Sequence, residues 1–205
     1  MVNSSNAKCL CARGDQQTSG LGQLQGIRGG LESDRYAPVL KAAEARLLLA
    51  LAAAEGAKVV KTDTKPAYLY GDMGDDVVYT RPPDWWREPI PEGHVFFLLK
   101  SIYGTRQAAH KWHTHISTWM EKNGYEAMSS EKTIVMKHKG SQYIIHGLFV
   151  DDMMHIYSSD AMKDEFLALY TKDFEITGDG DGQMETFLGM AVQQKDKSIR
   201  IHLDN

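Results

Sequence analysis

The sequence predicts an α+β fold in which an antiparallel sheet carries helices on one face. Three segments, at about 38–55, 107–123 and 160–174, have apolar residues at helical spacing. The segments around them hold short β-prone runs, several of which follow one another as hairpins. Strands grouped in this way favour antiparallel pairing over the strict alternation of strands and helices in a parallel sheet.

The composition fits one domain of ordinary size. The chain has 205 residues, and 42% of them are hydrophobic, which is enough for a core. The 2 cysteines cannot build a disulfide framework, and no leader or long apolar run is present, so we expect a soluble protein of a reducing compartment without a membrane partner. The net charge of −4 is unusual for a stand-alone nucleic-acid binder, so a polyanion would need a local basic surface or a metal.

The chain changes character near residue 35. Residues 1–35 are rich in Gly, Gln and Ser and hold few large apolar residues, so we expect an irregular segment there. Cys9 and Cys11 lie in it without a second pair at zinc-ligand spacing, and no metal is assigned to them. Residues 36–205 carry the apolar periodicity and form the predicted folded domain.

A helix and a strand lead to the first acidic residue of interest. The helix begins near Pro38 and stops at Gly56. Residues 57–62 are typical of a buried strand, which delivers Asp63 at its end, and Pro66 should break the ladder soon afterwards. Further strands are expected at 77–80, 95–99, 133–137, 142–150 and 153–157.

Two adjacent carboxylates, Asp151 and Asp152, lie between two of these β-prone runs, at the expected tip of a hairpin. Like charges side by side repel each other and resist burial, so a divalent cation is the natural partner, and hard oxygen ligands suit Mg²⁺. The alternative is an exposed Asp-Asp turn, which would be favoured for an isolated pair.

The C-terminal part contains a second motif that resembles a metal site. Residues 178–182 alternate Gly and Asp, as a calcium loop does, but Met184 stands where the closing bidentate Glu belongs. We therefore expect a turn there, followed by a hairpin made of residues 187–192 and 199–203.

An antiparallel sheet can bring Asp63 beside Asp151, although the two are far apart in the sequence. Carboxylates from two strands that share two Mg²⁺ ions are what in-line phosphoryl transfer requires. One ion lowers the pKa of an attacking hydroxyl, and the other neutralises the leaving pyrophosphate.

With these residues in this order, the chain resembles the reverse transcriptase domain of copia-type LTR retrotransposons, part of a Pol polyprotein. The matching blocks, in family order, are Tyr36–Val39, Arg46–Ala50, Asp63–Asp72, Ser101–Ala108, Phe149–Met153 and Phe187–Met190. The resemblance implies a right-hand polymerase palm with partial fingers and without a thumb. It also implies an RNA-directed DNA polymerase that adds dNTPs to a primer 3′ end with two Mg²⁺ ions, Mn²⁺ being an alternative.

The resemblance also assigns roles to residues. Asp63, Asp151 and Asp152 would be the catalytic metal ligands, and the Thr64 carbonyl would also reach metal. The nucleotide would be bordered by Tyr68, which would exclude a 2′-hydroxyl, together with Tyr103, Gly104, Arg106 and Gln107. The turn that supports the primer end would be Phe187, Leu188 and Gly189.

The resemblance implies partners and a location as well. These are a template-primer of RNA or DNA, the integrase and ribonuclease H parts of the polyprotein, and a cytoplasmic virus-like particle, with the nucleus as a second location. Some positions depart from the family pattern: Phe149 replaces Tyr, and Pro66 replaces Thr beside the catalytic strand.

Two alternatives to an active polymerase follow from the residues. One is a truncated, catalytically inactive retroelement remnant that binds nucleic acid or protein. The other, an unrelated metal nuclease, is disfavoured by the aromatic residue at Tyr68 and by the hairpin position of the aspartates.

Overall fold

The computed structural model describes the backbone of residues 23–24 and, in full, residues 36–80, 86–87, 89, 94–177, 184–195 and most of 198–203. The irregular segment expected over 1–35 therefore lies outside the described residues apart from 23–24, and so does the turn expected at 178–182. Contacts divide the chain into two units. Unit 1 comprises 1–37 and 67–115, and unit 2 comprises 38–66 and 116–205.

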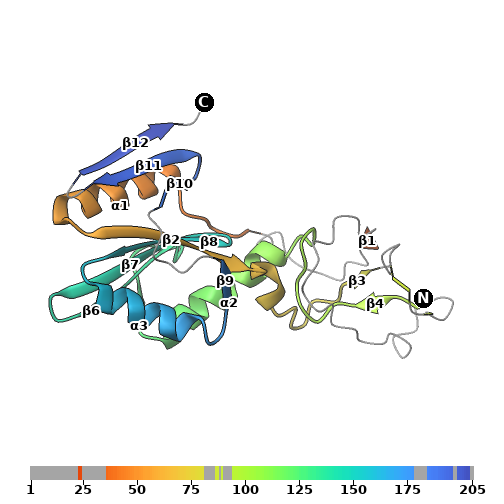
Figure 1. Cartoon of the computed structure of the whole chain (residues 1–205). Helices are drawn as coiled ribbons and strands as arrows, with labels where there is room; N and C mark the ends of the chain where they lie inside the picture. The colour runs from red at the N-terminus through yellow and green to blue at the C-terminus, as the bar shows by residue number, and fades with distance from the viewer. Residues whose placement is uncertain are drawn as a thin grey trace. The chain divides into compact units, whose positions relative to one another are not determined.

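Unit 2 holds most of the regular structure (Figure 1). Its helices are α1 (Ala42–Glu55) and α3 (Asp160–Tyr170), and α2 (Ala108–Lys122) runs across the boundary between the units. Its strands are β2 (Lys58–Lys65), β5 (Glu126–Ala127), β6 (Ile134–Lys139), β7 (Gln142–Phe149), β8 (Asp152–Tyr157), β9 (Glu175–Thr177), β10 (Thr186–Phe187), β11 (Met190–Lys195) and β12 (Ser198–Leu203).

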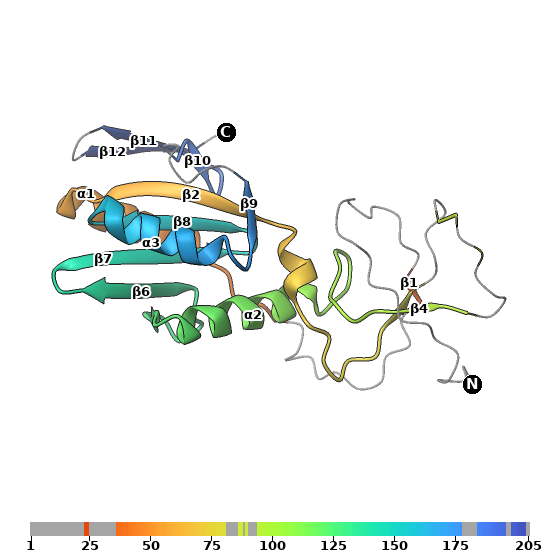
Figure 2. The same cartoon turned by 60° about the horizontal axis from the view of Figure 1, so that its bottom comes forward.

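Six strands form the central sheet, in the order β5-β6-β7-β8-β2-β9 (Figure 2). All of its pairs are antiparallel, as the sequence predicts. The strand β2 lies between β8 and β9 and continues through Asp63 to Lys65, rather than ending before the aspartate. Pro66 follows the last residue of β2, where its missing N–H would interrupt a ladder.

One face of the central sheet is covered by α1. Val59, Met154 and Ile145 are buried in one cluster with Leu40 and Leu48. The Leu40 side chain packs closely on β7 here, because a Cβ added at Gly147 would lie only 2.7 Å from one of its methyl groups. Glycine at this position of β7 therefore leaves room for the Leu40 side chain, which would have to shift if a larger residue replaced it.

The opposite face of the central sheet is covered by α3 and by the part of α2 that contains Trp119. The ring of Phe166 on α3 lies over the side chains of His146 and His155, which alternate with the residues that face α1. Trp119 packs edge-on against Phe166. Helices therefore lie on both faces of the sheet, and the expectation of helices on one face is wrong. The reason is that consecutive residues along β7 and β8, whose side chains point to opposite faces of the sheet, are both buried, so both faces must be covered.

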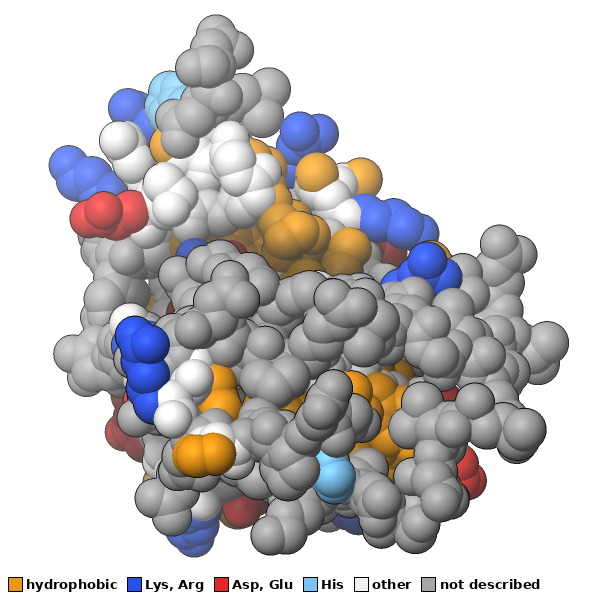
Figure 3. Space-filling view, turned by 90° about the vertical axis from the view of Figure 1, so that its right-hand side faces the viewer, with side chains coloured by type: hydrophobic (Ala, Val, Ile, Leu, Met, Phe, Trp, Pro, Cys, Tyr) orange, Lys and Arg blue, Asp and Glu red, His pale blue; other side chains and the backbone are white. Residues whose placement is uncertain are grey.

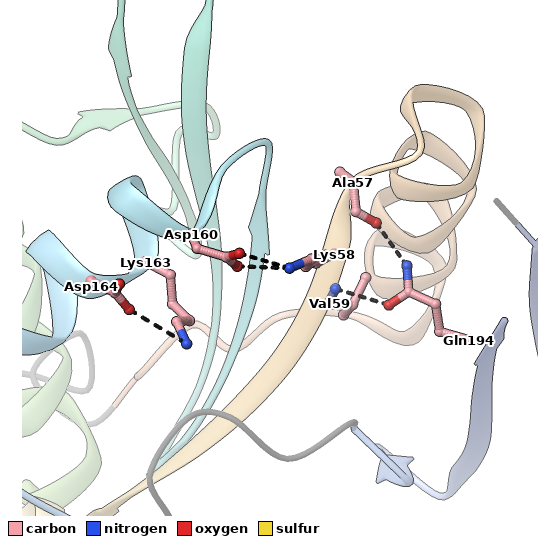
Figure 4. A network of polar contacts seen from close by, with 7 residues as sticks. All are labelled: Ala57, Lys58, Val59, Asp160, Lys163, Asp164 and Gln194. Carbon is pink, nitrogen blue, oxygen red and sulfur yellow. Dashed lines mark hydrogen bonds and ion pairs between the residues drawn. The ribbon is translucent and has the colours of Figure 1, made fainter. Parts of the chain in front are cut away.

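A second, three-stranded sheet in the order β10-β11-β12 packs against α1 and its side of the central sheet. One side chain connects it directly to β2. The amide of Gln194 accepts a hydrogen bond from the Val59 N–H at 3.0 Å and donates one to the Ala57 carbonyl at 2.7 Å (Figure 4). Gln194 thus takes the place of a neighbouring strand at the start of β2.

Unit 1 is built from short elements: β1 (Gln23–Leu24), η3 (Ala67–Tyr70), β3 (Tyr79–Thr80) and β4 (Phe96–Phe97). The three strands form a sheet in the order β1-β3-β4. Its small core contains Met73, Leu98 and Ile102. Lys111 of α2 ties the loop after η3 by an ion pair of 2.9 Å to Asp76 and a hydrogen bond to the Met73 carbonyl.

The predicted elements of the folded part agree with the structure in kind and differ at their ends. The three helices and the three long strands that flank the aspartates lie where the apolar periodicity places them. Among the described residues, no helix is long and apolar enough to cross a membrane.

Candidate functional site

Three carboxylates meet where β2 and the β7–β8 hairpin lie side by side. The register of the central sheet pairs Asp63 directly with Asp152 on one side and with Thr177 on the other. The Thr177 hydroxyl donates to the Asp63 carboxylate at 3.4 Å. The sheet therefore brings together Asp63 and the Asp151-Asp152 pair, as the sequence predicts.

The turn between β7 and β8 has an unusual backbone. Phe149 pairs with Asp152, so only Val150 and Asp151 form the turn. Val150 has a φ of 53°, in the left-handed region that β-branched residues strongly disfavour. A positive φ at the first central residue alone fits a type II′ turn, where glycine is the usual residue. Valine at this position carries backbone strain at the point where the acidic pair is presented.

The backbone of the turn is fixed to β2. The Thr64 N–H donates to the Asp151 carbonyl at 2.8 Å, next to Asp63 in the chain. The Thr64 hydroxyl lies on the other face, hydrogen-bonded to the Tyr170 hydroxyl at 2.8 Å. Burial raises the pKa of the Asp151 carboxyl above 3.8, and the negative charges of Asp63 and Asp152 raise it further. Asp63 and Asp152 are thus close enough to repel a negative charge on the Asp151 carboxylate.

A lysine compensates part of this repulsion. Lys61 lies two residues before Asp63 on β2, and its Nζ lies 2.8 Å from the Asp152 carboxylate. This charge acts to lower the pKa of Asp151. Among the residues that the structure describes, no group of three or more His, Cys, Asp or Glu side chains is placed to hold a metal ion.

The residues expected to border a nucleotide lie in unit 1. Tyr68 on η3 and Tyr103 pack together with their ring centroids 4.5 Å apart. The Ser101 hydroxyl donates to the Tyr68 carbonyl, which ties the two segments to each other. Gly104, with a φ of 93°, follows in a turn that leads into α2, and such a φ favours glycine. Arg106 is exposed, and the Gln107 carbonyl accepts the Lys111 N–H at 2.9 Å within the first turn of the helix.

The expected primer-positioning residues form the turn between β10 and β11. Phe187 pairs with Met190, and Leu188 and Gly189 are the two turn residues, both with positive φ, at 51° and 70°. Positive φ at both central positions is typical of a type I′ hairpin turn. Phe187 is buried in the core with α1, so the turn projects from a fixed base.

A profile of the family described as "Reverse transcriptase (RNA-dependent DNA polymerase)" matches residues 12–205, nearly the whole chain. The chain belongs to this reverse transcriptase family. The resemblance to copia-type elements is confirmed by its relatives.

Relatives are Pol proteins of transposons. The chain is 27% identical over 176 residues to the retrovirus-related Pol polyprotein from transposon TNT 1-94 of Nicotiana tabacum, covering 85% of this chain and 13% of that protein. It is 23% identical over 175 residues to the Pol polyprotein from transposon RE2 of Arabidopsis thaliana, covering 85% and 12%. The Ty1-BL Gag-Pol polyprotein of Saccharomyces cerevisiae is 27% identical over 164 residues, covering 77% and 9%. The chain thus spans about an eighth or less of these relatives. No solved structure gives a significant match.

Two features of this reverse transcriptase domain were missed by the sequence reasoning. The first is Lys61, whose two-residue spacing from Asp63 already places it on the same face of a strand. The second is a buried pair, His146 and His155, whose Nδ1 atoms lie 2.7 Å apart. His155 also makes a hydrogen bond of 2.8 Å with the Thr62 hydroxyl. The available signal for this pair was the single histidine inside each of the two β-prone runs that form the hairpin.

The described basic side chains that are visible on the face shown in Figure 3 do not gather into one patch. The described Lys and Arg side chains on that face are visible at several separate places. This distribution agrees with the net charge of −4.

Proposed function

We propose that the chain is the catalytic core of an RNA-directed DNA polymerase, with unit 2 corresponding to the palm and unit 1 to part of the fingers. The observation that carries the proposal is the direct pairing of Asp63 with Asp152 at the tip of the β7–β8 hairpin, in a member of the reverse transcriptase family. Carboxylates from two neighbouring strands, one of them at a tight turn, are a donor set suited to Mg²⁺.

The chemistry of the donor set fits two divalent ions, Mg²⁺ or Mn²⁺. Asp63 and Asp151 would hold them, with Asp152 and the Thr64 carbonyl as further oxygen donors. When bound, the ions would lower the pKa of the primer hydroxyl and neutralise the leaving pyrophosphate. The strands β2 and β8 orient the carboxylates, and the hydrogen bond from the Thr64 N–H to the Asp151 carbonyl keeps the turn beside β2.

The remaining predicted residues would bind the substrates. The Tyr68 ring, held by its contact with Tyr103, would exclude a ribonucleotide 2′-hydroxyl. Arg106 would contact a phosphate by a charge-assisted hydrogen bond, with Gly104 and Gln107 beside it. The β10–β11 turn, Phe187–Gly189, would support the primer end.

The partners and location follow from the polyprotein context of the relatives. We propose a template-primer of RNA or DNA, dNTPs and the integrase and ribonuclease H regions of a Pol polyprotein as partners. Reverse transcription would take place in a cytoplasmic virus-like particle, with the nucleus as a second location.

A second candidate function is that of an inactive remnant that binds nucleic acid or protein. It is favoured by one observation, the ion pair of 2.8 Å between Lys61 and Asp152, which engages one of the three carboxylates with a side chain of the protein itself. The two candidates differ in whether a divalent ion and a primer hydroxyl are used.

Primer extension on an RNA template with Mg²⁺ tests the proposal. Asp151→Asn should lower the rate roughly a thousand-fold, because loss of a metal ligand removes several kcal/mol of transition-state stabilisation. The matched control is Asp160→Asn, which removes an exposed aspartate at the other end of the sheet and should leave the rate unchanged. Equal extension by the unchanged chain and Asp151→Asn would contradict the polymerase and favour the remnant.

A further inference from the structure

Lys61 is placed to act on one carboxylate of the acidic cluster. Lys61 and Asp63 lie two residues apart on β2 and therefore point to the same face. The register pairs Asp63 with Asp152 and Lys61 with Met154, so the lysine lies two pairs further from the turn than the acids. From there its Nζ reaches the Asp152 carboxylate at 2.8 Å.

This ion pair differs from the other ion pair of the same strand. The side chains of Lys61 and Asp152 are 30% and 26% exposed, whereas those of Lys58 and Asp160 are 62% and 58% exposed. The Lys58–Asp160 pair, also 2.8 Å long, joins the start of β2 to the start of α3 (Figure 4). An ion pair that is sheltered from water is screened less by dissolved salt than an exposed one, so the charge of Lys61 acts on its carboxylate over a wider range of ionic strength.

A divalent cation and the Lys61 ammonium compete for the same oxygen atoms. A carboxylate oxygen that already lies 2.8 Å from an ammonium nitrogen is less available to a metal, and the positive charge of the ammonium repels a second cation. Asp63 is different in this respect, since its carboxylate accepts a hydrogen bond of 3.4 Å from the neutral Thr177 hydroxyl. The carboxylates of the cluster are therefore not equivalent before a metal arrives.

We propose that Lys61 is a positioning residue that holds Asp152 by an ion pair in the metal-free protein, so that Asp63 and Asp151 receive the first divalent ion and Asp152 joins only when the pair opens. The inference rests on the proposed function, because it assumes that the acidic cluster is a metal site. It assigns to Lys61 two effects: it stabilises the empty cluster and it weakens divalent-ion binding.

Mn²⁺ binding to the full chain, without template, primer or nucleotide, tests this directly by the electron paramagnetic resonance signal of free Mn²⁺. Lys61→Gln should tighten binding roughly three- to ten-fold, as expected for removal of a sheltered ion pair and its charge. Lys61→Arg keeps the ion pair and should bind Mn²⁺ like the unchanged chain. Lys58→Gln is the matched control, since it removes the same charge from the same strand three residues away and should change binding less than about two-fold.

A double-mutant cycle separates positioning from a general charge effect. If Lys61 acts through Asp152, Lys61→Gln should tighten binding in the unchanged chain and have no effect in an Asp152→Asn background. The same gain in both backgrounds would overturn the proposal, and so would unchanged affinity in Lys61→Gln or absence of Mn²⁺ binding in every variant. Thermal melts show whether each variant is folded. Because Mn²⁺ binding is measured without catalysis, a chain that binds Mn²⁺ but does not extend primers would contradict the proposed function alone.

Discussion

Polar residues of the same strand are partly exposed on one face of the central sheet and buried on the other. Along β2, Lys61 and Asp63 face one side and keep their charges near solvent, while Thr62 and Thr64 face the other, where they are 1% and 2% exposed. We call the first the acidic face, defined by Lys61, Asp63 and Asp152. We call the second the sealed face, defined by Thr62, Thr64, His146, His155 and Tyr170.

The sealed face consists of neutral groups that bond to one another. A hydrogen bond between the two Nδ1 atoms of His146 and His155 requires that only one of them carries a proton. Burial lowers the pKa of both rings, to about 3 for His155, so both are neutral. The comparison shows that charge is kept where ions and water have access, and that the same strand carries neutral pairs where they do not.

The largest expected effect comes from opening the sealed face at Phe166. Its ring is 1% exposed and lies 4.3 Å from the His146 ring and 5.0 Å from the His155 ring, measured between centroids. Phe166→Ala should lower the free energy of unfolding by about 3–5 kcal/mol, because it removes a large buried side chain and leaves a cavity. Urea denaturation measures the change. Leu47→Ala, at a position 70% exposed on α1, is the control and should change stability by less than about 0.5 kcal/mol.

The Phe166→Ala variant also tests whether a change on the sealed face affects metal binding at the acidic face. At a temperature where Phe166→Ala remains folded, its Mn²⁺ affinity should equal that of the unchanged chain, because the Phe166 ring lies on the side of the sheet opposite to the acidic face. A large loss of Mn²⁺ affinity in the folded variant would show that the faces are coupled.

The next effect is a dependence of stability on pH that the sealed face should impose. The folded-state pKa of His155 is about 3 and that of His146 is also lowered, while both are near 6.5 in the unfolded chain. The unfolded chain therefore binds more protons below pH 6.5, and stability is lost as the pH falls from 6.5 toward 3. His155 should contribute a slope of roughly 1.4 kcal/mol per pH unit, or about 2 kcal/mol at pH 5, and His146 should add to the loss in the same direction.

Urea midpoints measured between pH 7.5 and 5 check this slope. Replacing both histidines by Gln should flatten it, whereas His138→Gln, which removes an exposed histidine of β6, should not. A midpoint that stays constant from pH 7.5 to 5 would contradict neutral, buried histidines.

The sequence could predict the acidic face better than the sealed one. The β7–β8 hairpin and the strand that carries Asp63 were predictable because a two-residue turn between β-prone runs is a local signal. The pairing of β2 with β9, which brings Thr177 to Asp63, was not, because β9 has only 3 residues and its position depends on the helix before it. The pairings of Lys61 with Asp152 and of His146 with His155 depend on register between strands, which no single segment contains.

Local sequence patterns also did not show which helix packs on which face of the central sheet. Apolar residues surround most of α1, so that Leu47 and Leu51 are exposed while Leu48 and Leu49 are buried. With apolar residues on nearly all sides, the periodicity does not show which side of the helix packs on the sheet. Tertiary packing alone decides this, and it placed α1 and α3 on opposite faces.

The smallest expected effect concerns the strained turn of the acidic face. Val150 has a φ of 53°, and the strain of a non-glycine residue in such a conformation is of order 1–3 kcal/mol. Val150→Gly removes this strain but also gives the unfolded chain more freedom, which offsets part of the gain. A net stabilisation of about 1 kcal/mol is expected in urea denaturation, and Val135→Gly, in a strand with ordinary φ, should instead be strongly destabilising. If Val150→Gly is as destabilising as Val135→Gly, the valine is held by packing that outweighs its strain, and the turn that presents Asp151 is then as tightly fixed as the sealed face.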